Sequence, residues 1–391
     1  MLALVFAAVT AFLAMWIFVP APNRLLLPLA VGAPEVSAWL LLSGIVALLL
    51  ALPDVGASMV ARAAIALAVL ALTLAVSPLL RFSAVAASAE QSLQAALGSD
   101  YESRIPPERR ALFTPAPLTL AALVRGFGNH RNAVRITGGI EVAHHDGVRL
   151  TMNVYQPRDA GPHPALVQVY GGAWQRGHPG DFAEFATYIA AQGYVVFAID
   201  YRHAPRFTFP VQLDDVREAL RMIQTRAHEW DADPARLVLM GRSAGAHLAM
   251  LAAYAADAPP VLGVIDYYGP VDLVEGYRNP PVPDPLRVRV IEEAFLGGPP
   301  DVMLARYQEA SPISLVTRLL PPTLLIYGGR DHIVESRFGA MLADSLRRHG
   351  GTVVHVEIPW AEHAFDAVPN GISGQLSRYV TERFLAAVVN R

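Results

Sequence analysis

The sequence has neither cysteine nor lysine, and the lack of cysteine limits its chemistry. All 31 basic side chains among its 391 residues are arginines. A chain without cysteine cannot be a disulfide-stabilised scaffold, and it cannot hold zinc or an iron–sulfur cluster through thiolates. The lack of lysine, together with abundant alanine, glycine and proline, indicates a GC-rich bacterial coding sequence and excludes no function.

Charge is also scarce, at 17% of residues against roughly 25% in average soluble proteins. The deficit lies in residues 1–80, where Arg24, Glu35, Asp54 and Arg62 are the only charged side chains. The remainder has the charge density of an ordinary soluble domain. The net charge of −3 gives no electrostatic reason to expect nucleic acid as a partner.

Three apolar runs, at about 2–19, 36–52 and 63–80, explain the missing charge. Each has 17 or 18 residues, close to the ~20 that a membrane-spanning helix needs. A signal peptide would explain the first run alone, but that run lacks a basic start and a small-residue cleavage site. Three buried core helices would need polar faces that these runs lack. We therefore expect residues 1–85 to form a three-helix transmembrane anchor, with the lipid bilayer as partner.

The arginines near these runs bear on the orientation of this multi-pass anchor. Arg24 and Arg81 would lie on one side of the membrane, and Arg62 and the N-terminal amine on the other. The positive-inside rule therefore leaves the side of the following domain open. The cytoplasm is the side that we expect.

The remaining chain divides into a connector, 86–135, and a larger domain, 136–391. The connector mixes polar and apolar residues at helical spacing, which is typical of a short helical lid and equally of a solvated linker. In the domain, short β-rich runs alternate with helical segments. The expected strands lie at 147–155, 165–170, 195–200, 237–240, 261–268, 323–327 and 353–358, and the expected helices at 181–192, 212–229 and 244–256. This alternation predicts an α/β fold with a mostly parallel sheet flanked by helices, in which ligands bind where the strands end.

One strand runs directly into Gly241-Arg242-Ser243-Ala244-Gly245 and then into an alanine-rich helix. A G-x-S-x-G sequence between a strand and a helix is typical of a nucleophile held on a sharp turn. We therefore expect Ser243 to be a catalytic nucleophile.

A serine nucleophile needs a base, and the base needs a carboxylate to orient it. Asp331 follows the expected strand 323–327, and His363 follows the next strand, so both fall where a parallel sheet gathers its active-site loops. Glu335 and Asp366 are alternative acids. His332 is a weaker candidate for the base because it would occupy the loop of the acid.

The oxyanion of an acyl-transfer reaction requires hydrogen-bond donors close to the nucleophile. Gly171 and Gly172 follow the strand 165–170, and two consecutive glycines let the backbone approach a substrate. We expect their N–H groups to act together with that of Ala244. Trp174 and Arg242 are expected to border the substrate pocket.

Together these segments resemble the α/β-hydrolase superfamily, and within it the hormone-sensitive-lipase-like and kynurenine-formamidase-like carboxylesterases. The motifs that carry the resemblance are Tyr170-Gly171-Gly172-Ala173-Trp174, Asp200-Tyr201-Arg202-His203-Ala204-Pro205, Gly241–Gly245, Gly329-Arg330-Asp331 and Glu362-His363-Ala364-Phe365. The chain departs from these families at two positions. Tyr170 replaces the histidine that usually begins the oxyanion motif, and Arg242 replaces the acidic residue or histidine that usually precedes the nucleophile.

The sequence thus predicts a membrane-anchored serine hydrolase that cleaves small-molecule carboxylic esters through an acyl-enzyme. The triad Ser243, His363 and Asp331 requires no cofactor and no metal. An amidase or formamidase would use the same residues, so the sequence does not separate the two activities. A non-catalytic binding module with this fold is the alternative from another class. A three-helix transporter is less consistent with the sequence, because no apolar run carries an interior ionisable residue.

Overall fold

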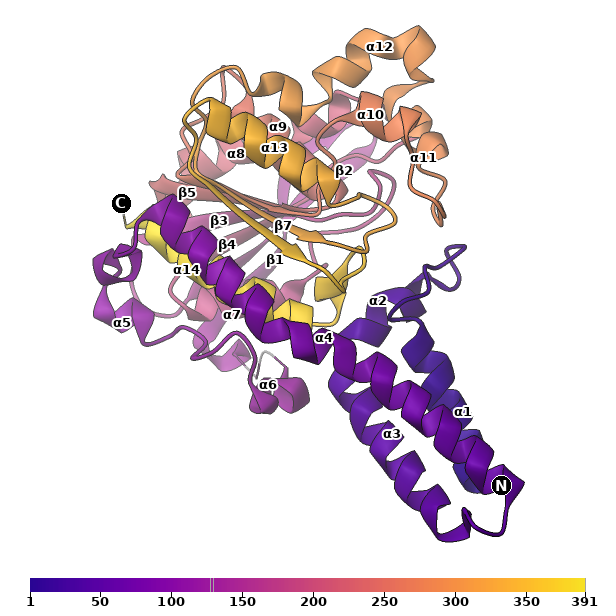
Figure 1. The fold of residues 1–391 in the computed structure, drawn as a ribbon. Coiled ribbons are helices and arrows are strands. Elements are labelled where there is room, and N and C mark those ends of the chain that lie inside the picture. The colour runs from indigo at the N-terminus through magenta and orange to yellow at the C-terminus, as the bar shows by residue number, and fades with distance from the viewer. Residues whose placement is uncertain (127, 129, 391) are drawn as a thin grey trace.

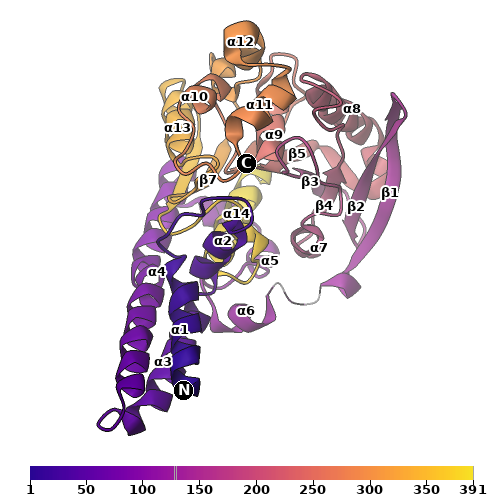
Figure 2. The same ribbon diagram turned by 90° about the vertical axis from the view of Figure 1, so that its right-hand side faces the viewer.

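A computed structural model describes residues 1–126, 128 and 130–390 (Figure 1). Phe127 and Asn129 of the expected connector, and Arg391 at the end of the expected domain, lie outside the described residues. A narrow bundle of helices extends from one side of a larger α/β domain, and the N-terminus lies at the far end of that bundle (Figures 1 and 2).

The domain is built on one eight-stranded sheet with the order β1-β2-β4-β3-β5-β6-β7-β8. Its strands are β1 (Val134–His145), β2 (Val148–Pro157), β3 (His163–Val169), β4 (Val195–Ile199), β5 (Ala232–Arg242), β6 (Gly263–Tyr267), β7 (Thr323–Gly328) and β8 (Val353–Ile358). β1 pairs antiparallel with β2, and β2 pairs antiparallel with β4, whereas the other neighbours are parallel. Every residue of β3, β4 and β6 is buried, because helices cover both faces of the parallel part.

Two sets of helices cover the sheet (Figure 1). On one face lie α8 (Val211–Arg226), α9 (Ala244–Tyr254) and α13 (Arg337–Arg348), and on the other lie α7 (Ala183–Ala191), α14 (Ile372–Val389) and the second half of α4 (Met59–Leu97). Between β6 and β7 the chain forms α10 (Leu273–Arg278), α11 (Val288–Leu296) and α12 (Pro300–Glu309). This mixed sheet between helices confirms the fold class expected from the sequence.

α4 joins the two parts of the molecule as a single helix. Its 39 residues correspond to about 58 Å. The first half packs against α1 (Leu2–Met15) and α3 (Ser37–Ala51), and the second half lies along β8 and α14. The expected domain boundary after residue 85 therefore falls inside a continuous helix.

The bundle differs from the expected set of three spanning helices. Two segments, Ser37–Asp54 and Met59–Leu97, are long and apolar enough to cross a membrane. α1 has 14 residues, about 21 Å, because the chain turns after Met15. The segment expected to connect α1 with α3 holds a further helix, α2 (Leu27–Glu35), which contains Pro28, Gly32 and Pro34.

None of the described residues of the connector 86–135 lines the cavity that contains Ser243. The short α-helices of the connector are α5 (Pro107–Arg110) and α6 (Leu120–Arg125). It also holds the 3₁₀ helices Tyr101–Arg104 and Arg131–Ala133; the other 3₁₀ helices in the described part of the chain are Leu52–Asp54, Ala227–Trp230, Pro312–Leu315 and Phe365–Ala367. The backbone N–H of Thr114 donates to Glu382, and that of Thr119 donates to Gln375. These bonds hold the described part of the connector against α14, so this segment packs on the domain.

Candidate active site

Ser243 occupies a sharp turn between β5 and α9. Its φ is +52°, in the left-handed region that non-glycine residues seldom adopt. The turn cannot be wider because the backbone around Gly245 is packed closely against β3. A Cβ on Gly245 would lie 2.3 Å from the carbonyl oxygens of Val169 and Tyr170, at the end of β3. The Ser243 side chain consequently projects from the carboxyl edge of the sheet.

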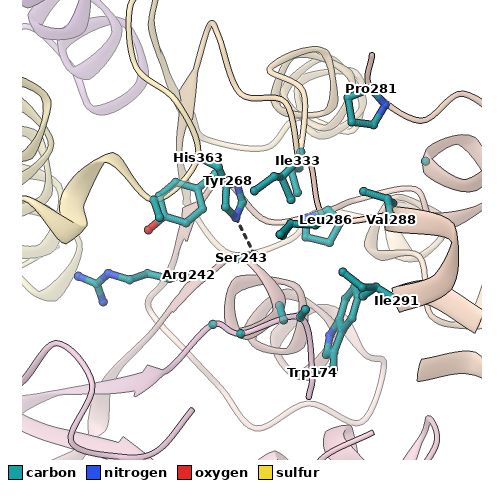
Figure 3. A pocket seen from close by; sticks show the side chains of 18 of the residues that line it. Trp174, Arg242, Ser243, Tyr268, Pro281, Leu286, Val288, Ile291, Ile333 and His363 are labelled. Atoms are coloured by element: carbon teal, nitrogen blue, oxygen red, sulfur yellow. Dashed lines mark hydrogen bonds between the residues drawn. The ribbon is translucent and has the colours of Figure 1, made fainter. Parts of the chain in front are cut away.

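The structure brings Ser243, His363 and Asp331 together in one line of hydrogen bonds. The Ser243 hydroxyl donates to His363 Nε2 over 2.9 Å (Figure 3). On the other side of the ring, His363 Nδ1–H donates to Asp331 Oδ2 over 2.7 Å. The other Asp331 oxygen accepts the backbone N–H groups of Ile333 and Val334, each over 2.8 Å. These bonds leave Asp331 aimed at the imidazole.

The alternative acids and base are occupied elsewhere. Glu335 pairs with Arg337 over 2.8 Å, and Asp366 pairs with Arg242 over 2.5 Å. His332 Nδ1–H donates to Glu362 over 2.7 Å. The geometry therefore favours Asp331 and His363 over the alternatives that the sequence leaves open.

The expected oxyanion donors lie on the wall of the same cavity as Ser243. Gly171, Gly172 and Ala244 all line that cavity. A Cβ on Gly171 would lie 3.2 Å from the Ser243 Cβ, so the glycine allows the loop to approach the nucleophile.

Tyr170, which replaces the usual histidine of the motif, braces this loop. Its hydroxyl donates to Asp200 and lies 2.9 Å from His203 Nε2. Its ring stacks on Tyr201 with centroids 4.5 Å apart. Tyr170 thereby ties the start of the loop to the segment that follows β4.

The cavity above Ser243 has a volume of about 390 Å³ and largely apolar walls (Figure 3). Sequence reasoning identified Trp174 as one wall, and the structure places its indole there, stacked on Phe295 at 4.2 Å. The sequence does not indicate the other apolar walls. They include Tyr268, Pro281, Leu286, Val288, Ile291 and Ile333, and also Leu27, Pro28 and Val31 of α2. Only long-range packing brings these residues to the site, and no local motif marks them.

His247 and His145, two histidines outside the line Ser243–His363–Asp331, have structural partners. His247 Nε2–H donates to the Ala310 carbonyl over 2.6 Å, and Nδ1 accepts from the Trp174 indole over 3.2 Å. Burial lowers the pKa of His247 to about 4, so this imidazole is neutral. His145 lies beside Glu218, next to the tight turn that joins β1 to β2. Within the described part of the chain, no three His, Cys, Asp or Glu side chains are grouped to hold a metal ion.

Comparisons with known proteins bear on the family and the class of enzyme. Residues 152–346 match the protein-family model described as BD-FAE. The chain is 28% identical over 291 residues to the probable carboxylic ester hydrolase LipM of Mycobacterium tuberculosis, covering 70% of this chain and 65% of LipM. It is 30% identical over 242 residues to the esterase LipQ of the same organism, covering 58% of this chain and 56% of LipQ. The chain thus spans less than two thirds of either relative.

The crystal structure of esterase B from Lactobacillus rhamnosis has the same fold. Its TM-score is 0.51 at 21% identity, over 60% of this chain and 79% of that one. The sheet and its flanking helices form an α/β-hydrolase fold, and the family model and the esterase relatives support that superfamily. The named relatives support an esterase within it.

Arg242 borders the cavity but directs its charge away from the nucleophile. Its guanidinium points away from Ser243 (Figure 3) and donates to the buried Asp366 carboxylate. It also lies 4.0 Å from the ring centroid of Phe182. The charge of Arg242 is thus neutralised by Asp366 behind the nucleophile.

Asp366 also connects Arg242 to the base. The Tyr268 hydroxyl donates to Asp366, and the Tyr268 ring lies 4.6 Å from the His363 imidazole. The residue before the nucleophile is thus linked to the base through a buried carboxylate and an aromatic ring.

Replacing Arg242 with Met should destabilise the domain by about 3–5 kcal/mol, because Asp366 would keep a buried charge without its partner. The double variant Arg242→Met/Asp366→Leu should recover most of this loss. Thermal unfolding of the purified variants measures both effects. The control Arg226→Met removes an exposed ion pair with Glu229 and should leave the midpoint almost unchanged. Equal midpoints for Arg242→Met and the wild type would contradict the structural role of the buried pair.

Proposed function

We propose that this chain is a membrane-anchored serine hydrolase that cleaves carboxylic esters through an acyl-enzyme. The observation that carries the proposal is the hydrogen-bonded line Ser243–His363–Asp331 beneath an apolar cavity. The esterase relatives support the same reaction. We further propose that the chain is one of the hormone-sensitive-lipase-like esterases, which its Tyr170–Trp174 and Gly241–Gly245 motifs resemble.

In the first step, Ser243 Oγ attacks the ester carbonyl carbon while His363 Nε2 accepts the hydroxyl proton. Asp331 holds the imidazole in the tautomer with hydrogen on Nδ1 and stabilises the imidazolium. The carbonyl oxygen becomes an oxyanion, and the N–H groups of Gly171, Gly172 and Ala244 are its proposed donors.

In the second step, His363 returns its proton to the ester oxygen as the bond from carbon to that oxygen breaks and the alcohol leaves. Water then attacks the acyl-enzyme, giving one proton to His363, which passes it to Ser243 Oγ. The carboxylic acid leaves and the enzyme is restored. Neither step draws on a cofactor.

The bundle of α1, α3 and the first half of α4 supports membrane anchoring, because its packing is the reverse of a water-soluble bundle. Small residues fill the interior. Among the buried ones are Ala7, Ala11, Ala14, Gly44, Ala47, Ala51, Ala61, Ala64, Ala68, Ala71 and Ala75. Large apolar side chains point outward, among them Val5, Phe6, Val9, Phe12, Leu42, Ile45, Leu49, Val69 and Leu70.

Small residues between closely packed helices are typical of membrane proteins, where lipid covers the large outer side chains. In water, so large an exposed apolar surface would favour aggregation. Thr10 and Ser43 share a hydrogen bond of 2.8 Å between α1 and α3, as polar residues do between helices in a bilayer. We infer that α3 and α4 cross the membrane and that the shorter α1 packs against them.

Replacing Ser243 with Ala should lower kcat on p-nitrophenyl butyrate by a factor on the order of 10⁶, because no other group is placed to attack. Asp331→Asn should lower kcat by up to ~10⁴, because an amide in place of the carboxylate favours the wrong tautomer of His363. Steady-state kinetics measures both. The matched controls Ser103→Ala and Glu335→Gln change a surface serine and a carboxylate bound to Arg337, so they should keep wild-type rates. A nearly active Asp331→Asn beside an inactive Glu335→Gln would show that Asp331 is not the acid.

The pH profile should follow the ionisation of His363. Burial alone would lower the pKa of His363, but the charge and hydrogen bond of Asp331 raise it above the ordinary 6.5. Only neutral His363 accepts the serine proton, so kcat/KM should rise with pH through a pKa above 6.5 and fall in acid. A profile that stays flat down to pH 5 would contradict His363 as the base.

Full-length protein should remain in the membrane pellet after alkaline carbonate extraction, because lipid covers the outer face of the bundle. Immunoblotting of pellet and supernatant measures the distribution, and a known peripheral membrane protein serves as the control for extraction. Recovery of a folded, monodisperse protein in the supernatant without detergent would contradict the anchor.

A further inference from the structure

One wall of the active-site cavity comes from the N-terminal segment rather than from the hydrolase domain. Leu27, Pro28 and Val31 of α2 line the cavity that contains Ser243 and His363, and Arg24 lines it from the preceding loop. The sequence suggested no contribution of this segment to the site. The structure therefore makes the segment part of the substrate cavity.

Two contacts hold this wall in a fixed position against the catalytic residues. The Glu35 carboxylate at the end of α2 accepts the backbone N–H of Ser373, at the start of α14, over 2.8 Å. The guanidinium of Arg330, the neighbour of Asp331, donates to the Phe18 carbonyl. The segment from Phe18 to Glu35, which includes α2, thus contacts the domain at both of its ends.

α2 also leads directly into a proposed spanning helix. It ends at Glu35, and α3 begins at Ser37. Its nine residues correspond to about 13 Å. The cavity therefore lies within roughly that distance of the first turn of α3, where the half-exposed Trp39 has the position of an aromatic residue at a membrane interface.

Two apolar side chains lie beside lining residues of the cavity and are almost fully exposed. Leu25 follows the lining residue Arg24 and is 86% exposed, and Val282 follows the lining residue Pro281 and is 90% exposed. Leu25 and Val282 are far apart in the sequence, but their neighbours Arg24 and Pro281 line the same cavity. Apolar side chains at such a position are stabilised when they enter the boundary between lipid headgroups and acyl chains.

From these observations we infer that the substrate is a long-chain ester dissolved in the bilayer, which reaches Ser243 from the membrane surface along α2. The inference rests on the proposed ester hydrolysis and adds its substrate class. The apolar chain lies against Leu27 and Val31 on one side and Ile291 on the other, and the ester group reaches Ser243. A cavity of about 390 Å³ is within the range of ligand pockets, roughly 300–1,000 Å³.

The test uses full-length protein in phosphatidylcholine vesicles and two substrates. p-Nitrophenyl palmitate is dissolved in the same vesicles, and p-nitrophenyl butyrate is supplied in water. Val31→Trp fills the cavity beside α2, and Val31→Asn makes the same wall polar with little change of volume. Val69→Trp is the matched control, because Val69 is 48% exposed on the outer face of α4 and does not line the cavity.

Both Val31 variants should lower the ratio of kcat/KM for palmitate to that for butyrate at least fivefold, and Val69→Trp should keep it within twofold. Palmitate supplied in separate vesicles should be hydrolysed at least tenfold more slowly than palmitate in the enzyme's own vesicles. The inference is wrong if both Val31 variants fold and keep the wild-type ratio, or if palmitate is hydrolysed at equal rates from the two vesicle populations. In either case, hydrolysis of butyrate would still support the proposed esterase. Loss of hydrolysis of both esters by the wild type would refute the proposed function itself.

Discussion

The close approach of β3, β5 and α9 at Gly241 and Gly245 is the constraint on which the rest of the site depends. A Cβ on Gly241 would lie 2.3 Å from the backbone nitrogen of Ala246, and one on Gly245 would meet the end of β3 at the same distance. With no space for side chains there, the chain can pass from strand to helix only through the left-handed conformation of Ser243. The same contact places the loop after β3, with its paired glycines, beside the serine.

A second layer of buried polar groups fixes the base. Glu362 accepts the backbone N–H groups of His332 and His363, while Asp366 accepts from Arg242 and Tyr268. These two carboxylates hold the loop around His363 from both sides. Arg242, an unusual residue before a nucleophile, belongs to this layer. It stabilises the shape of the site without adding charge to an apolar cavity.

The residues of the proposed triad could be named from the sequence because a parallel sheet brings the loops after its strands to one edge. Asp331 and His363 each follow an apolar run that the structure confirms as a strand, so their place in the chain predicted their place in space. The helix α9 and its glycine-flanked serine were likewise evident from local sequence.

The parts that could not be predicted depend on contacts between distant segments. α2 carries Pro28, Gly32 and Pro34, a composition typical of a loop, and its helix packs against α14 through Glu35. Hydropathy located the run 63–80, but α4 continues to Leu97 because its alanine-rich second half packs on β8 and α14. The direction of the Arg242 side chain depends on Asp366, 124 residues later in the chain.

We propose that the strained turn makes Ser243 the nucleophile. Intact-mass and peptide-mapping mass spectrometry of the folded full-length protein, after treatment with a serine-reactive fluorophosphonate, tests this proposal most directly. We expect a single adduct, located on Ser243, whose formation abolishes ester hydrolysis. A protein that remains unlabelled while it hydrolyses esters, or one labelled at a different serine, would contradict it.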